Sequence, residues 1–311
     1  MLSRVAETIF WLGRYMERTN GMLQLLRTNY ISSQDAISDF SWKPLLLTYG
    51  ELKEHQVAGM EQDSRKVLDY LVLDRDNGGS VYNSVRQSRE NARAVQDHIT
   101  KEVWQTLNDF YHFIRDPRFE QQFKTEDPVT TIDSLLRHGL LFSGTVKNTM
   151  TRDESYTYLH LGKFIERAIL TTDIVKINLR EHHFTYRQRV ESPALRYLLY
   201  SLLGYEIYMK TYKGNFNPQD VLETVIYNSY FPHSLIYSLN QLNRYFERLK
   251  EDSLAESYEE VEFLIGKTMN SVKYSNLLMD DVKMVREFLK ETRQQLIEIG
   301  NCFGKFYFGN T

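Results

Sequence analysis

The stretch LGRYMER spans Leu12–Arg18, and a close copy, LGKFIER, spans Leu161–Arg167. Around each copy, apolar side chains recur three and four residues apart, which is the spacing of a helix with a long packing seam. The repetition predicts an all-α protein, a multi-helix bundle built from two tandem pseudo-symmetric helical repeats. The two stretches would then be equivalent central helices of that bundle.

Each copy places a glycine, Gly13 or Gly162, in the middle of a segment that otherwise favours a helix. A glycine inside a helix costs roughly 1 kcal/mol relative to alanine. At each glycine we therefore expect a neighbouring atom that lies so close that a side chain would not fit. A neighbouring helix is the favoured occupant, and a ligand is the alternative.

Glu17 and Glu166 occupy corresponding places in the two copies, on the helix face that carries the apolar and glycine positions. A buried carboxylate needs a partner because its desolvation costs several kcal/mol. We predict that both glutamates are mostly buried and that each accepts a hydrogen bond from an arginine. The candidate donors are Arg14, Arg18, Arg89, Arg93, Arg152 and Arg167. Such pairs would fix the helix register, or would line a shared functional pocket.

A second pair of similar segments supports the duplication. Leu71–Val85 resembles Val225–Leu239, and the alignment pairs Ser80 with Ser234 at nearly the same separation as the two glutamates. The repeat unit is therefore several helices long. We predict a first repeat at residues 1–148 and a second at 149–311, packed together as one domain.

Helices are expected wherever the helical periodicity runs between turn residues. The predicted helices span residues 3–32, 42–50, 61–72, 80–115, 129–149, 152–181, 192–213, 218–227, 232–252, 256–271 and 273–307. Ser80 is predicted to cap one helix, and Thr151 with Glu154 has the pattern of a capping box. The clearest connectors are Asp116–Val129 and Glu181–Ser192.

Composition narrows the possible partners. The chain has 311 residues, a formal charge of −3 and one cysteine, Cys302. No basic cluster interleaved with aromatics points to nucleic acid, and no apolar run is long enough to predict a membrane span. The first residues do not follow the pattern of a secretory signal. We therefore expect a cytoplasmic protein with neither nucleic acid nor membrane as its partner.

Motifs that would bind a cofactor or metal are not found in the sequence. The pair Asp74 and Asp76 opens like a calcium loop but lacks the closing carboxylate, so a turn before a helix is expected. Glu181-His182-His183 is interpreted as the end of a helix. No Gly-rich phosphate loop or nucleophile elbow occurs, so no cofactor and no metal are predicted, and ATP would bind a partner protein.

Several colinear motifs together resemble the alpha-E family, a bacterial all-helical family named after its Glu-Arg motif. They are the opening MLSRVAETIFWLGRYMER, DRDNGGS at Asp74–Ser80, RENARAV at Arg89–Val95, Trp104, RDESYTYLHLGKFIERA at Arg152–Ala168 and FPHS at Phe231–Ser234. The chain departs from the family pattern at Arg75 and Gly78, where prolines are usual, and at His233, where arginine is usual. The resemblance implies work beside circularly permuted ATP-grasp proteins and transglutaminase-like peptidases, in forming or modifying peptide or amide bonds.

Two function hypotheses remain open. The first is a helical partner or substrate-holding protein without activity of its own, which works with an ATP-grasp amidoligase or a transglutaminase-like peptidase. The alternative is an enzyme in which Glu17 and Glu166, flanked by the arginines, perform acid–base chemistry on an anionic peptide-like substrate. Sealed Glu–Arg pairs would favour the first hypothesis, and a carboxylate cluster in an open cavity would favour the second.

Overall fold

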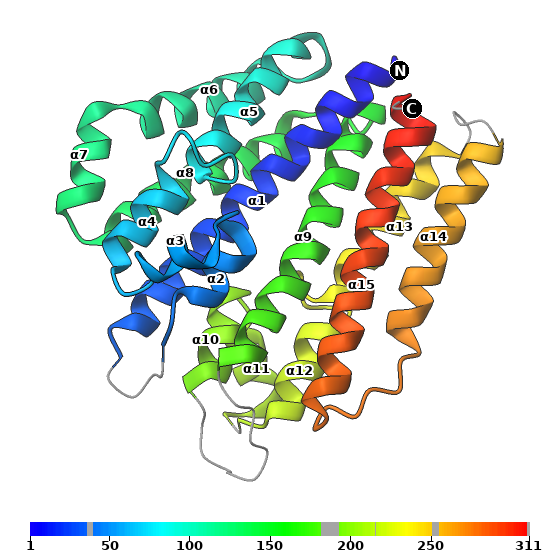
Figure 1. Ribbon diagram of the computed structural model, residues 1–311. Helices are drawn as coiled ribbons and strands as arrows, with labels where there is room; N and C mark the ends of the chain where they lie inside the picture. Colours follow the sequence, from blue (N-terminus) through cyan, green and yellow to red (C-terminus); the bar gives the residue numbers. More distant parts are fainter. Residues whose placement is uncertain (36–39, 182–192, 215, 251–254, 310–311) are drawn as a thin grey trace.

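Every regular element of the described residues is helical in the computed structural model, which describes residues 1–35, 40–181, 193–214, 216–250 and 255–309 (Figure 1). The α-helices are α1 (Ser3–Ser33), α2 (Lys43–Tyr49), α3 (Glu54–Ala58), α4 (Ser64–Val72), α5 (Val81–Ala94), α6 (Lys101–Arg115), α7 (Pro117–Thr125), α8 (Pro128–Thr149), α9 (Glu154–Glu181), α10 (Pro193–Ser201), α11 (Tyr205–Tyr212), α12 (Pro218–Tyr227), α13 (Leu235–Phe246), α14 (Ala255–Lys273) and α15 (Val282–Phe303). This confirms the all-α prediction.

The two Glu-Arg stretches lie on the two long central helices, α1 and α9, which pack side by side (Figure 1). Their apolar seams are buried, with Ile9 and Leu12 on α1 and Leu161 and Ile165 on α9 fully removed from solvent. This paired core is therefore what the helical periodicity of both stretches encodes.

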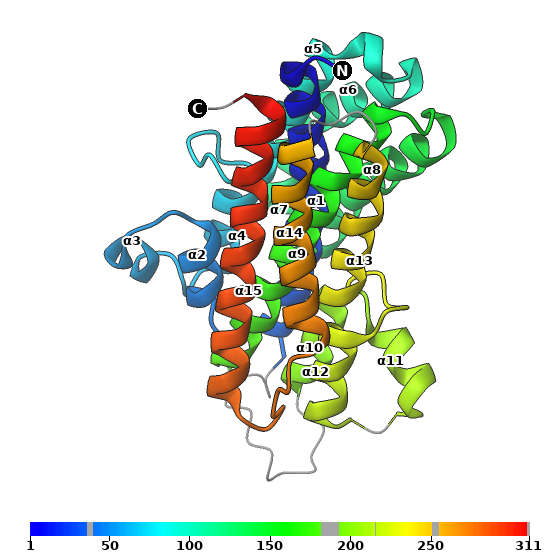
Figure 2. The same ribbon diagram turned by 90° about the vertical axis from the view of Figure 1, so that its right-hand side faces the viewer.

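Each central helix belongs to its own group of four helices. Helix α1 packs against α5 and α8, and α6 packs against both of these helices. Helix α9 packs against α13 and α15, and α14 packs against both of those (Figure 2). The α1–α9 contact joins the two groups into one molecule.

Two shorter helices cross from one group to the other. Helix α2, which follows α1 in the chain, packs against α9, and α10, which follows α9, packs against α1. Both helices thus lie over the central pair, and their ends reach the region of the Glu-Arg motifs.

Several predicted helix boundaries are wrong for identifiable reasons. The connector predicted at Asp116–Val129 contains α7, because Asp116 caps that helix and Pro117 starts it, and Asp127 with Pro128 does the same for α8. The predicted helix 80–115 is divided at Val95, whose backbone leaves the helical region. The short α3 was also missed.

The second half shows the same kind of error. The predicted helix 192–213 is broken at Leu203, which has a positive φ of 57°. The last helix begins at Val282 and not at residue 273, because Asp281 caps it there. Helix α12 spans the predicted residues 218–227.

One predicted cap is confirmed and one is wrong. The Ser80 side chain accepts a hydrogen bond from the Asn83 backbone N–H, as predicted. At α9, however, it is Asp153 that accepts from the Tyr156 N–H, and Thr151 lies outside the helix. The connector expected at Glu181–Ser192 lies outside the described residues except for Glu181, the last residue of α9, and the His182-His183 pair also lies outside them. Among the helices that are described, none is both long and apolar enough to cross a membrane.

Candidate functional site

Helices α1 and α9 approach each other closely at the two glycines. A Cβ on Gly13 would overlap the carbonyl oxygen of Leu159, and a Cβ on Gly162 would overlap that of Phe10. In both cases the obstacle is backbone of the opposite helix, which cannot rotate away. The packing interpretation of the glycines is therefore confirmed, since backbone of the opposite helix fills the space of each missing side chain.

Glu17 is held from the opposite helix by Arg167. The Arg167 Nε donates to Glu17 Oε1 at 2.5 Å and its Nη2 donates to Oε2 at 3.0 Å, so the pair is bidentate. Glu17 is only 6% exposed. The remaining Arg167 nitrogen, Nη1, donates to the Pro232 carbonyl at 3.2 Å, which ties the loop before α13 to the same pair.

Glu166 is held in the reverse direction by two arginines of α1. Arg18 Nε donates to Glu166 Oε1 at 2.7 Å, and Arg14 Nε donates to Oε2 at 2.9 Å. Glu166 is 2% exposed. The prediction that both glutamates are buried and accept hydrogen bonds from arginines is confirmed, with each motif helix holding the glutamate of the other.

Both carboxylates are stabilised as anions. Burial alone would raise the pKa of Glu17, but the charges of Arg167 and Lys163 together with the Arg167 hydrogen bonds lower it to about 2. The pKa of Glu166 is likewise lowered, since Arg18 and Arg14 outweigh its burial. The Glu166 charge in turn raises the pKa of Arg18.

The other predicted donors have different partners. Arg89 donates to Asn108 Oδ1 at 3.0 Å and pairs with Glu90. Arg93 lies 3.7 Å from Glu90 and is largely exposed. Arg152 donates to the backbone carbonyls of Met150 and Lys147 and stacks over Tyr156. The structure therefore brings Arg14, Arg18 and Arg167 to the glutamates and places Arg89, Arg93 and Arg152 elsewhere.

The two Glu–Arg pairs have different surroundings. Glu17, Arg167, Lys163 and His233 line a cavity of about 330 Å³ whose other walls are mainly apolar. Glu166 does not line this cavity, so the two carboxylates do not share one pocket. The Glu17 end of the paired motif is therefore open to a ligand.

Around Glu166 the corresponding space holds protein side chains. The Tyr49 hydroxyl, at the end of α2, is buried there, and burial with the nearby Asp173 and Glu166 charges raises its pKa. Arg293 of α15 reaches across to Asp173, with Nε 2.8 Å from Oδ1. These groups form a closed polar layer on the Glu166 side.

Sequence reasoning missed the residues that make the two sides differ. Lys163 and His233 at the cavity, and Asp173 and Arg293 at the closed side, were not among the predicted site residues. One signal was present in the motif itself, since LGKFIER has Lys163 where LGRYMER has Arg14. Within the described residues, no group of three or more acidic, His or Cys side chains is arranged to hold a metal ion.

The sequence that carries these Glu–Arg pairs matches a known family. Residues 1–308 match the profile of Alpha-E, described as "a predicted alpha-helical domain with a conserved ER motif". The chain belongs to the Alpha-E family. In this Alpha-E protein two Glu-Arg dipeptides, Glu17–Arg18 and Glu166–Arg167, bind each other across the α1–α9 interface.

Relatives of this Alpha-E chain include uncharacterized mycobacterial proteins. One of Mycobacterium bovis and one of Mycobacterium tuberculosis are each 26% identical to it over 259 residues, which is 77% of this chain. The chain spans only about 29% of the length of these relatives. No solved structure matches the chain.

Proposed function

We propose that this Alpha-E domain is a non-catalytic, cytoplasmic helical partner that holds a peptide-like substrate for an ATP-grasp amidoligase or a transglutaminase-like peptidase. The observation that carries the proposal is the reciprocal pairing of Glu17 with Arg167 and of Glu166 with Arg18. In these pairs both motif carboxylates are bonded to arginines of the opposite helix and hold the two helices together. What they leave for a ligand is a cavity at one end of the interface.

Acid–base catalysis by the two glutamates fits this geometry poorly. A general acid or base works best when its pKa lies near the working pH. The pKa of Glu17 is about 2, and that of Glu166 is also lowered, so both remain ionised near neutral pH. Each carboxylate is also saturated by arginine nitrogens, and the two glutamates do not line one cavity. These facts favour a protein that holds its substrate over an enzyme that converts it.

We further propose that the two groups of four helices arose by duplication, with repeats near 1–148 and 149–311. Helices α8 and α15 are each 22 residues long and occupy the same place in their groups. Ser80 and Ser234 cap α5 and α13 in the same way, each accepting from the backbone N–H three residues later. The reciprocal contacts of α1 and α9 also support equivalence of the two central helices.

The partner class comes from the family resemblance and is supported indirectly by the relatives. More than two thirds of each mycobacterial relative lies outside the matched region, which leaves room for further domains. A domain that holds the substrate of a partner enzyme would function equally well as a separate protein or fused to that enzyme.

Purification of the tagged chain from its native cells after mild cross-linking tests the proposal. We expect an ATP-grasp or transglutaminase-like protein to copurify, and we expect added chain to increase ATP-dependent ligation by that partner. The isolated chain should form no amide bond itself. Ligation by the isolated chain that is lost in a folded Glu17→Gln variant would instead establish the enzyme hypothesis.

A further inference from the structure

The cavity beside Glu17 combines an apolar wall with a basic end. Its apolar lining includes Leu136, Leu140, Leu170, Ile174, Leu202 and Leu203. The basic end consists of Arg167 and Lys163, with Glu17 and His233 beside them. A volume of about 330 Å³ is within the range of small-ligand pockets.

The charge at the basic end is not balanced. Arg167 is neutralised by Glu17, with which it forms both hydrogen bonds. Lys163 is different: among the described residues, no carboxylate lies within ion-pair distance of its Nζ. Burial lowers the pKa of His233 to about 3, so this side chain is neutral near pH 7. The cavity therefore carries one excess positive charge, which an anion would balance.

Two features of the helices around the cavity distinguish it from the Glu166 side. Gly139 is the twelfth residue of α8, and the twelfth residue of α15 is Arg293, which fills the closed side by reaching Asp173. At Gly139 even a Cβ would overlap the side chain of Asn20. Across the cavity, Leu203 adopts a positive φ of 57° and is 55% exposed. Strained, exposed apolar residues are common at ligand sites.

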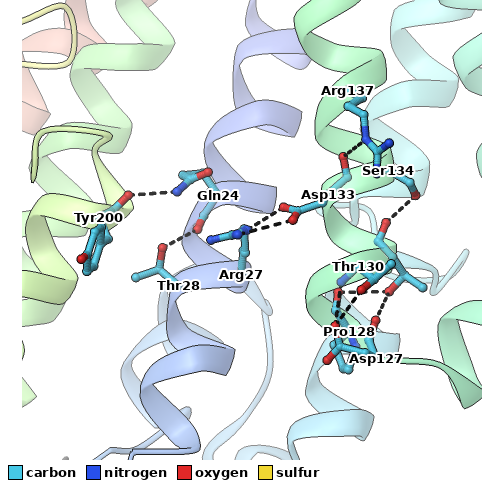
Figure 3. A network of polar contacts seen from close by, with 11 residues as sticks. Gln24, Arg27, Thr28, Asp127, Pro128, Thr130, Asp133, Ser134, Arg137 and Tyr200 are labelled. Atoms are coloured by element: carbon cyan, nitrogen blue, oxygen red, sulfur yellow. Dashed lines mark hydrogen bonds and ion pairs between the residues drawn. The ribbon is translucent and has the colours of Figure 1, made fainter. Parts of the chain in front are cut away.

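The cavity continues into a wider groove between α1, α8 and α10. Gln24, Leu136, Leu140 and Leu203 line both spaces, and the groove has a volume of about 600 Å³. Figure 3 shows its polar side: Arg27 Nε donates to Asp133 Oδ1 at 2.6 Å, and Gln24 donates to the Tyr200 carbonyl at 2.9 Å.

We propose that the cavity binds the C-terminal carboxylate of a peptide that ends in apolar residues, with Lys163 as its counterion and the preceding residues in the groove. This inference rests on the proposed function and names the substrate end that is held. A fatty acid would share the carboxylate and the apolar group. The groove also carries partly exposed polar side chains, Arg27 and Asp133, which can bond to a peptide backbone but not to an alkyl chain, and for this reason we favour the peptide.

Isothermal titration calorimetry of the full chain tests the proposal with a matched pair of probes. The probes are acetyl-leucyl-leucine and acetyl-leucyl-leucinamide, which differ only in the terminal charge. We expect the acid to bind at least about tenfold more tightly than the amide, the effect of one charge-assisted hydrogen bond. In Lys163→Met this difference should disappear while the chain stays folded.

Neighbouring residues provide the controls. Leu140 and Leu141 are 68% and 59% exposed, but only Leu140 lines the cavity. Leu140→Asp should weaken binding of the acid at least tenfold, by charge repulsion and loss of apolar contact, whereas Leu141→Asp should not. Lys101→Met removes a positive charge from the exposed start of α6 outside the cavity, and it should leave both affinities unchanged.

The inference is wrong if the acid does not bind, if acid and amide bind equally, or if Lys163→Met keeps the preference. Octanoate that binds more tightly than the acid peptide would assign the cavity to fatty acids and would also overturn it. If the native-cell purification still recovers an ATP-grasp or transglutaminase-like partner, the proposed function survives such a failure. Binding of the acid peptide without such a partner would instead overturn the proposed function alone.

Discussion

Gly13 and Gly162 each lie against the backbone carbonyl located three residues before the other, Leu159 for Gly13 and Phe10 for Gly162. The contact is reciprocal and places the two helix backbones closer than any side chain would allow. The Glu–Arg pairs begin one turn further along each helix. The glycines therefore set the distance that the arginines must span.

Alanine at either glycine should destabilise the fold. The added Cβ meets backbone, so the helices must separate, and we expect Gly13→Ala and Gly162→Ala each to lower the free energy of unfolding by about 3 kcal/mol. Urea denaturation measures the change. Gly144 and Gly266 are helical glycines with no atom within 4 Å of an added Cβ, so alanine there should stabilise by about 0.5–1 kcal/mol. Equal effects at all four glycines would contradict the packing argument.

Removing one partner of a buried pair should cost more than removing both. We expect Glu17→Gln to destabilise by about 3–5 kcal/mol, because Arg167 is left buried without its counterion. The double variant Glu17→Gln with Arg167→Met should recover part of that loss. A double-mutant cycle measures the coupling from the free energies of unfolding of the wild type and the three variants, obtained by thermal or chemical denaturation. Strictly additive effects would show that the pair is not coupled in solution.

The sequence predicted the central features well because they depend on local patterns. The seams of α1 and α9, the buried glutamates and the Ser80 cap all follow from residue spacing within one helix. Which arginine reaches which glutamate depends on how two helices cross, and no local pattern determines that. Arg89, Arg93 and Arg152 were plausible donors for this reason.

The residues and helix starts that were not predicted correctly also depend on contacts between segments far apart in the sequence. The cavity beside Glu17 is lined by residues far in sequence from its motif, such as Leu140 of α8 and Leu203, which has a positive φ. The Asp-Pro steps at Asp116 and Asp127 read as connectors, yet each consists of an N-cap followed by a proline at the first helical position. Their role is visible only once the following helix is known to pack.

His160, which is buried, and His233, which is half-buried, should make the protein sensitive to mild acid. Burial lowers the pKa of His160 and of His233 to about 3, below the usual 6.5, so below pH 6.5 the unfolded chain binds protons that the folded chain does not. This stability is complete above pH 6.5 and is lost as the pH falls toward 3. We expect each histidine to contribute about 1 kcal/mol per pH unit in that window.

Urea denaturation at pH 7.5 and 5.5 tests whether the two histidines cause this loss of stability. His233→Asn should reduce the loss of stability between the two pH values, whereas His98→Asn, at an exposed position, should leave it as in the wild type. A wild type with equal stability at both pH values would rule out burial of neutral histidines.

Lys163 and Arg14 occupy the same position in the two motif copies, yet their removal should have opposite effects on stability. Arg14 donates to Glu166, so Arg14→Met should destabilise by about 1.5–3 kcal/mol, the contribution of a hydrogen bond to a charged group. Lys163 has no such bond among the described residues, and burial lowers its pKa, which means that its charge is costly in the folded state. Lys163→Met should therefore leave stability unchanged or raise it by about 1 kcal/mol. Parallel denaturation curves at pH 7 compare the two variants. A large loss for Lys163→Met would mean that this lysine supports the fold through Glu17, and a small loss for Arg14→Met would mean that Arg18 holds Glu166 alone.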